Sequence, residues 1–165
     1  MILTGVLPLL AADPAVRRLV ERARSAVRTP LDVLVPLGAR PPLVARIAAA
    51  APGGPVVVVA ATGREADDLA AALRCYLPAD DVAVLPSWET LPHERLSPRS
   101  DTVARRLAVF RRLAHPAAPD REHGGAIRVL VVPIRALLQP VVAGLGDLEP
   151  VEINPGSTVD LTDLA

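Results

Sequence analysis

The chain has 165 residues, of which 51% are apolar and only 2% aromatic, so it carries enough apolar material for the core of one ordinary domain. Acidic and basic residues balance at 18 each, which excludes a large field of one sign that would steer the whole molecule to nucleic acid or membrane. All 18 basic residues are Arg. The absence of Lys excludes a Schiff-base lysine and the lysine of a conventional phosphate-binding P-loop.

The cysteine content and the lengths of the apolar runs limit the cellular compartment in which the protein can work. Cys75 is the single cysteine, which excludes an intrachain disulfide and a cysteine-based zinc site and suits a reducing compartment. No apolar run reaches the ~18 residues of a membrane span. Residues 1–12 resemble a short signal-peptide core, but no basic residue precedes them and Arg17 and Arg18 follow closely. We therefore expect a cytoplasmic protein that does not contact a membrane.

The first predicted elements are a helix, a strand and a second helix. Asp13 followed by Pro14 is a helix start, and the helix is expected to continue to Val27. The apolar run Leu31–Val35 predicts a buried strand. Residues 36–42 are predicted to form a loop, and residues 43–51 a helix.

Strands and helices then alternate. Four consecutive valines within Pro55–Ala60 predict a strand that is apolar on both faces and lies inside a parallel sheet. Thr62 and Glu65 form a capping box that begins a helix ending near Leu77. The later elements, in chain order, are a strand at 82–85, an irregular stretch at 86–98, a helix at 100–114, a loop at 115–125, a strand at 127–132 and a short helix at 133–139.

This alternation predicts an α/β fold with a mainly parallel sheet and helices on both faces. The pattern changes after Pro140, because residues 144–165 carry five acids and no Arg, with a strand expected at 151–153 and a helix starting near Val159. We therefore expect three parts: an N-terminal helical segment at 1–29, the α/β domain at 30–143, and the cut beginning of a second small domain at 144–165.

A parallel sheet directs the search for a nucleotide site to the ends of its strands. The loop after the first expected strand contains Gly38, Arg40, Pro41 and Pro42, but it has no Lys and no Ser or Thr for magnesium. The two prolines also remove backbone amides that would cradle a phosphate. We interpret it as a degenerate phosphate loop and expect neither a nucleotide nor any other cofactor in this segment.

Other candidate sites are weaker. Arg64, at the N-terminus of the capped helix, could hold an anion, although the capping box explains these residues without a ligand. Arg105 and Arg112 lie seven residues apart on a helix whose apolar stripe is expected at Val103, Leu107, Phe110 and Ala114. They could contact phosphates or form a solvated face. No catalytic or metal site is expected, and the three histidines are interpreted as solvated loop residues: His93, His115 and His123.

The segment from Trp88 to Pro98 contains the only Trp and follows an expected buried strand. Its sequence, Trp-Glu-Thr-Leu-Pro-His-Glu-Arg-Leu-Ser-Pro, closely resembles a motif of the bacterial transcription-repair coupling factor (Mfd) family. The agreement continues upstream through residues 56–59 and 62–69 and downstream through 129–133 and 137–140, so the resemblance covers roughly residues 30–165. The motif residues carried over are Trp88, Glu89, Thr90, Leu91, Pro92, Arg95, Ser97 and Pro98.

The resemblance implies the N-terminal, UvrB-like region of a large DNA translocase that displaces stalled RNA polymerase and recruits nucleotide excision repair. In that family the first domain has a RecA-like core that has lost nucleotide binding, and the second domain docks onto UvrA. The ATP- and magnesium-dependent motor and the parts that contact RNA polymerase and DNA lie farther along and are absent here. We expect the docking surface for UvrA to lie mostly beyond Ala165, so no docking residue is assigned.

The resemblance predicts a non-catalytic scaffold, and two alternatives remain. One is a free-standing α/β enzyme that takes a phosphate substrate at Thr62–Arg64. The other is a basic DNA-binding module that uses residues 95–135, a stretch that contains nine Arg and only three acidic residues. Trp88 is expected to hold its long segment on the domain by packing, with direct contact to a partner as the alternative.

Overall fold

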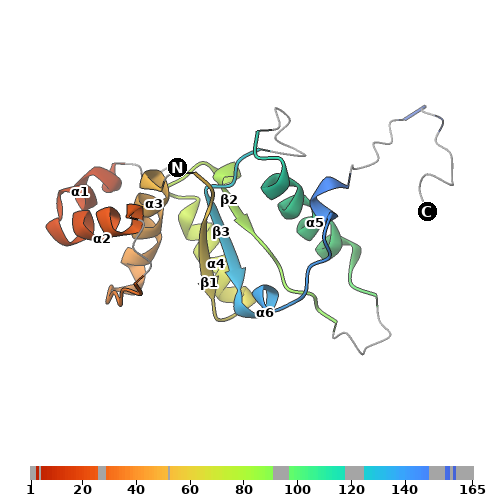
Figure 1. Cartoon of the computed structure of the whole chain (residues 1–165), viewed down its shortest axis with the longest axis horizontal. Coiled ribbons are helices and arrows are strands. Elements are labelled where there is room, and N and C mark those ends of the chain that lie inside the picture. Colours follow the sequence, from red (N-terminus) through yellow and green to blue (C-terminus); the bar gives the residue numbers. More distant parts are fainter. Residues whose placement is uncertain are drawn as a thin grey trace.

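The computed structural model describes residues 3, 5–25, 29–51, 53–90, 97–117, 125–148, 155–156 and 158. Its centre is a parallel sheet of three strands, β1 (Val56–Ala60), β2 (Val82–Val84) and β3 (Val129–Pro133), in the order β1-β3-β2 (Figure 1). Val129 of β3 lies opposite Val56 on one side and Val82 on the other. The predicted α/β class with a parallel sheet is confirmed.

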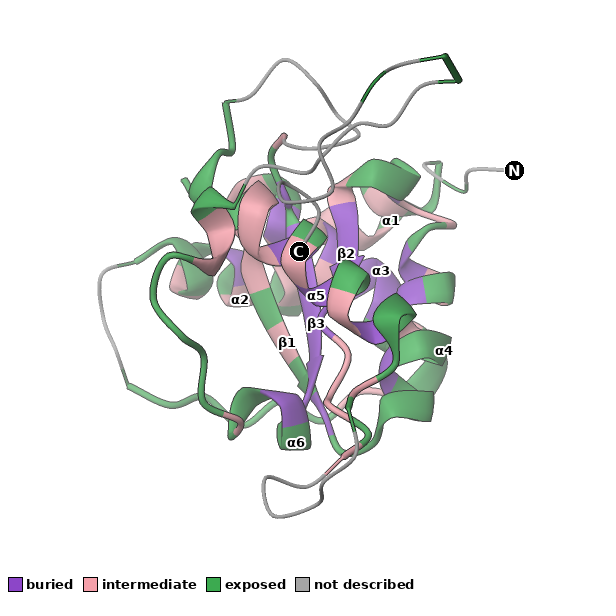
Figure 2. Cartoon of the chain, turned by 90° about the vertical axis from the view of Figure 1, so that its right-hand side faces the viewer, coloured by how far each residue is buried: buried purple, intermediate pink, exposed green. Residues whose placement is uncertain are grey.

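The burial of the strands differs from the prediction for β1. All of β3 is buried, as its central place requires (Figure 2). The valine run of β1 was predicted to be interior, but β1 is an edge strand of the described sheet. Val57 and Val59 are 51% and 48% exposed. The prediction was wrong because an apolar run shows only that the strand suits a buried position. The order of the strands in the sheet decides which strand is buried on both sides.

Helices cover both faces of the sheet, as predicted. The helices α3 (Arg40–Ala50) and α4 (Gly63–Leu73) pack on one face, in a cluster that we call the α4-face core. The helix α5 (Ser100–Ala114) packs on the other, in the α5-face core. The α4-face core contains Ala45, Ala48, Ala60, Ala66, Ala70, Leu73, Leu77, Val82, Val129 and Val131. The α5-face core contains Ala83, Leu85, Val109, Ile127, Leu130, Val132 and Ala136.

The predicted helix starts are present. The Asp13 carboxylate accepts hydrogen bonds from the backbone N–H groups of Ala15 and Val16 and begins α2 (Pro14–Arg24). The Thr62 hydroxyl accepts from the N–H of Glu65, and the Glu65 carboxylate accepts from the N–H of Ala61, which caps α4. The apolar start of the chain, which resembled a signal-peptide core, forms a separate helix α1 (Val6–Ala12).

The prediction of a buried strand at Leu31–Val35 is wrong. No strand forms there, and Leu34 is fully exposed, at 102% of its reference area. A strand needs a neighbour for its backbone groups, and no described strand pairs with this segment. The predicted loop at 36–42 is also corrected: a 3-10 turn (Leu37–Ala39) leads into α3, whose first turn holds Pro41 and Pro42. Proline fits there because the first N–H groups of a helix have no intrahelical acceptor.

The last described elements fold back onto α5. The short helix α6 (Ile134–Leu137) follows β3, and a 3-10 turn η3 (Leu145–Asp147) packs against α5. A Cβ added to Gly146 would lie 2.7 Å from the carbonyl oxygen of Phe110, so only glycine fits this contact. His115, predicted to be a solvated loop residue, pairs with Asp147, with 3.3 Å between Nε2 and Oδ1.

The first predicted helix ends earlier than expected, at Arg24 rather than Val27, because Ser25 is already extended. Some predictions fall outside the described residues: the strand at 151–153, the helix near Val159, and the loop residues His93 and His123. The three predicted parts of the chain remain a prediction. No described helix is long and apolar enough to cross a membrane. Within the described residues, no group of three or more His, Cys, Asp or Glu is placed to hold a metal ion.

Candidate functional site

The Trp88 segment leaves the carboxyl end of β2 and is fastened to the chain that follows β3. The backbone N–H of Trp88 donates to Oε1 of Gln139 at 2.9 Å, and Nε2 of Gln139 donates to the Trp88 carbonyl at 3.5 Å. Gln139 comes just after α6. The carboxyl edge of a parallel sheet is where ligands bind in open α/β folds. Here, two separate stretches of the chain are joined at that edge.

Arg106 of α5 lies under the Trp88 ring. Its side chain is only 1% exposed, and its Cζ lies 4.3 Å from the centre of the Trp88 ring and 5.5 Å from that of Phe110. Its Nη1 donates to the carbonyl of Pro86 at 2.5 Å. Burial lowers the pKa of the Arg106 guanidinium, because the charged form loses hydration. The π faces of the two rings and one carbonyl replace part of that hydration.

The sequence did not identify Arg106, because the predicted apolar stripe placed a different face of α5 inward. Val103, Leu107 and Phe110 are half-buried, with Phe110 packed against the α5-face core, and Ala114 is exposed, so the predicted stripe is only partly confirmed. The buried residues of α5 are Thr102, Arg106 and Val109. A hydrophobicity pattern assigns charged residues to the exposed face, so it cannot predict that an arginine lies at the centre of the contact between α5 and the Trp88 segment.

Glu89, next to Trp88 in the motif, is joined to the same helix. The Thr102 hydroxyl donates to the Glu89 carboxylate. This bond is the main cause that lowers the pKa of Glu89, and backbone hydrogen bonds and the charge of Arg99 act in the same direction. Trp88 and Glu89 thus both contact α5, through Arg106 and Thr102. Of the other motif residues, Thr90 and Pro98 are half-buried and Ser97 is exposed, while Leu91, Pro92 and Arg95 lie outside the described residues.

The segment that we interpret as a degenerate phosphate loop leads into α3 and forms its first turn. Gly38 lies in the preceding 3-10 turn, and Arg40 is the first residue of the helix. Pro41 and Pro42 are buried, so their rings pack inward at the position where a phosphate cradle would present amides. Residues 36–42 contain no Lys, Ser or Thr, and Pro41 and Pro42 offer no backbone N–H, so the loss of nucleotide binding at this loop stays a prediction.

The three other predicted phosphate contacts, Arg64, Arg105 and Arg112, lie apart from one another, and two of them have partners within the chain. Arg64 is 93% exposed and lies 4.0 Å from the Asp68 carboxylate one turn later, which is a surface pair of small energetic value. Arg105 is exposed. Arg112 donates to the carbonyls of Asp80, Gly125 and Ala126, so it joins α5 to the loops that precede β2 and β3. The structure does not bring Arg64, Arg105 and Arg112 into one site.

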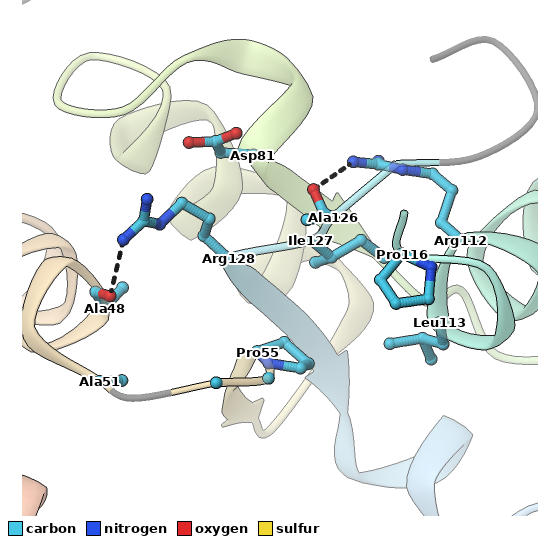
Figure 3. Close-up of a pocket in the computed structure, with 12 residues that line it drawn as sticks. Ala48, Ala51, Pro55, Asp81, Arg112, Leu113, Pro116, Ala126, Ile127 and Arg128 are labelled. Atoms are coloured by element: carbon cyan, nitrogen blue, oxygen red, sulfur yellow. Dashed lines mark hydrogen bonds between the residues drawn. The ribbon is translucent and has the colours of Figure 1, made fainter. Parts of the chain in front are cut away.

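A cavity of about 390 Å³ lies where the strands begin, at the edge of the sheet opposite to the Trp88 segment (Figure 3). Arg112 and Arg128 are on its wall, and Figure 3 shows both guanidinium groups directed at backbone carbonyls, those of Ala126 and Ala48. Ala48 is near the C-terminus of α3, where unpaired carbonyls favour a cation. We interpret these arginines as structural groups that hold helix ends and loops together.

Comparison with known proteins extends the resemblance. No protein-family model matches the chain. The chain is 48% identical over 154 residues to the transcription-repair-coupling factor of Mycobacterium bovis, and equally similar to that of Mycobacterium tuberculosis. The aligned part is 93% of this chain but 12% of each relative. Over nearly its whole length the chain is similar to a segment of the transcription-repair coupling factors, so the resemblance predicted from Trp88–Pro98 is confirmed.

Proposed function

We propose that this chain is the UvrB-like part of a transcription-repair coupling factor, where it acts as a non-catalytic scaffold in the cytoplasm. The observation that carries the proposal is the 48% identity over 93% of the chain, which includes the Trp88 motif. The whole protein would be an ATP-dependent DNA translocase that displaces stalled RNA polymerase and recruits excision repair through UvrA. Its motor, its magnesium and its contacts with DNA and polymerase would lie outside this segment.

Two features support a non-catalytic role. The loop that would bind a nucleotide has buried prolines in place of amide donors and lacks both the cation and the magnesium ligand. At the carboxyl edge of the sheet, the Trp88 segment is bound by the side chains of Gln139 and Arg106. The chain's own residues therefore occupy part of the region that a ligand would use in related topologies.

The exposed apolar surface supports a scaffold role. Val57 and Val59 of the edge strand are about half exposed, and the segment after β3 carries exposed large side chains. These are Leu137, Leu138, Val141 and Val142. Surfaces of this kind are commonly covered by another domain or protein, since an open strand edge with apolar side chains favours association. The two alternatives, a phosphate enzyme and a DNA-binding module, receive less support because Arg64, Arg105 and Arg112 do not lie in one site and Arg112 is bound to backbone carbonyls.

Calorimetry with magnesium-ATP tests the non-catalytic part. We expect no heat of binding, and micromolar affinity would overturn it. The variant Arg40→Lys is the matched control, because it restores the cation but not the amides that Pro41 and Pro42 lack. We expect this variant also to bind no ATP.

A chimera tests the parentage. The matched segment of the mycobacterial coupling factor is replaced by this chain, and repair of the transcribed strand is compared with repair of the other strand in cells that lack their own factor. We expect the chimera to restore faster repair of the transcribed strand. A stable chimera that retains ATP hydrolysis but gives equal repair of both strands would contradict the proposal.

A further inference from the structure

A groove of about 570 Å³ lies between α2 and the segment Leu31–Val35, and the proposed function does not use it. Arg18, Leu19 and Arg22 contribute one wall from α2, while Leu31 and Val33 contribute the other. The buried side chain of Leu43, from α3, closes the floor. Figure 1 places α2 and α3 at one end of the molecule, away from α5, so the groove is separate from the Trp88 segment.

The Leu31–Val35 wall can pair with a strand. Residues 29–36 contain no helix, turn or bend, and the sequence Leu-Asp-Val-Leu-Val suits a strand. Within the described part of the chain, no backbone hydrogen bond involves residues 31–35. Leu31 is 54% exposed and Val33 47% exposed. Toward the described residues, the segment therefore presents unpaired backbone donors and acceptors beside apolar side chains, and an extended peptide could bond to them as it does to the edge strand of a sheet.

The α2 wall sets the charge of the occupant. Arg18 and Arg22 are one helical turn apart, and neither side chain has a hydrogen bond or ion pair with a described residue. Among the described residues that line the groove, Asp32 is the only acid. Guanidinium groups bind carboxylates with two parallel hydrogen bonds, so a row of carboxylates complements this wall.

We propose that this groove binds an extended acidic segment of a partner protein. The segment pairs its backbone with Leu31–Val35, places alternate apolar side chains against Leu19 and Leu43, and directs its carboxylates at Arg18 and Arg22. The inference does not depend on the proposed function, since it rests on the groove, the unpaired backbone and the unpaired arginines.

The test uses the full chain and a short fluorescent peptide of alternating valine and glutamate, measured by fluorescence anisotropy. We expect saturable binding that charge reversal of both Arg18→Glu and Arg22→Glu weakens by about tenfold or more. The matched control reverses Arg17→Glu and Arg24→Glu, which lie on the same helix but do not line the groove. This control should change the affinity by less than about threefold.

Two further measurements separate the modes of binding. A peptide in which proline replaces the valines loses the backbone N–H at every second residue and cannot adopt a regular strand, so it should not bind, and this change leaves the protein intact. Equal weakening by the two pairs of charge reversals would indicate nonspecific attraction and overturn the proposal. Absence of saturable binding would do the same. A dimer in light scattering that the valine–glutamate peptide does not dissociate would also overturn it, because a second copy would then occupy the groove.

Discussion

The two faces of the sheet are held by different chemistry. The α4-face core is purely aliphatic, with Ala66, Ala70 and Leu73 at 0% exposure. The α5 face combines aliphatic residues with Arg106 and Thr102, both buried, and with the half-buried Trp88 above them. The first face is stabilised mainly by removing apolar surface from water, whereas the second also depends on hydrogen bonds and a cation–π contact.

The comparison shows where the fold is permissive and where it is specific. An aliphatic core of the right volume accepts many sequences. A buried guanidinium accepts few, because each unsatisfied N–H in a dry site costs free energy. In Arg106, Nε is buried and has no hydrogen-bond partner among the described residues. We infer that the α5 face gives up some stability in order to hold the Trp88 segment in one position.

The largest effect is expected on the aliphatic face. Leu73→Ala leaves a cavity between α4 and the sheet and should lower the free energy of unfolding by about 3 kcal/mol. Urea unfolding followed by circular dichroism measures this change. Leu69→Ala is the control, since Leu69 lies on the same helix but is only half-buried, and its loss should be smaller. Equal losses would show that the α4-face core is not centred on Leu73.

The second effect tests whether the charge of Arg106 stabilises the fold. Arg106→Ala removes the bond to Pro86 and leaves a cavity, so we expect a loss of about 2.5 kcal/mol in urea unfolding. Arg106→Met keeps most of the volume without the charge, and should lose less than about 1 kcal/mol. Loss in the methionine variant as large as in the alanine variant would show that the cation itself stabilises this face.

The sequence predicted the local elements well and their places in the fold poorly. Valine runs and capping residues report local preferences, so three strands and the starts of α2, α4 and α5 agree with the structure. The failures need tertiary information. Leu31–Val35 has the composition of a strand but no described strand beside it. The valines of β1 are at an edge because β3, later in the chain, takes the centre.

The candidate site divides in the same way. The residue types alone identify the motif at Trp88. The absence of Lys, Ser and Thr near Pro41 is likewise visible in the sequence, and it predicts a loop that does not bind phosphate. Arg106 and Gln139 were not predicted, because their importance comes from contacts with a distant part of the sequence. Arg106 lies 18 residues after Trp88, and Gln139 lies 51 residues after it. A single sequence carries no record of such a pairing unless the partner type is unusual.

The third effect concerns the Trp88 ring. Trp88→Ala removes a half-buried indole and its contact with Arg106, and we expect a loss of about 2 kcal/mol in urea unfolding. Trp88→Phe retains an aromatic face over the guanidinium and should lose less than half as much. A loss below about 0.5 kcal/mol in Trp88→Ala, accompanied by loss of partner binding, would instead indicate that the ring serves a partner contact.

The smallest effect is a change in the acid titration of Glu89. Thr102→Val removes the hydroxyl that donates to the Glu89 carboxylate, so the pKa of Glu89 should rise toward its ordinary value of 4.5. A lowered pKa in the folded state contributes stability above the unfolded value, and this contribution is lost as pH falls through the folded pKa. The valine variant should therefore show a weaker dependence of stability on pH in this acidic range. Thr102→Ser keeps the hydroxyl and should keep the low pKa. Side-chain NMR titration of Glu89 distinguishes the two variants, and an unchanged pKa in Thr102→Val would mean that the backbone hydrogen bonds and Arg99, rather than Thr102, hold the carboxylate.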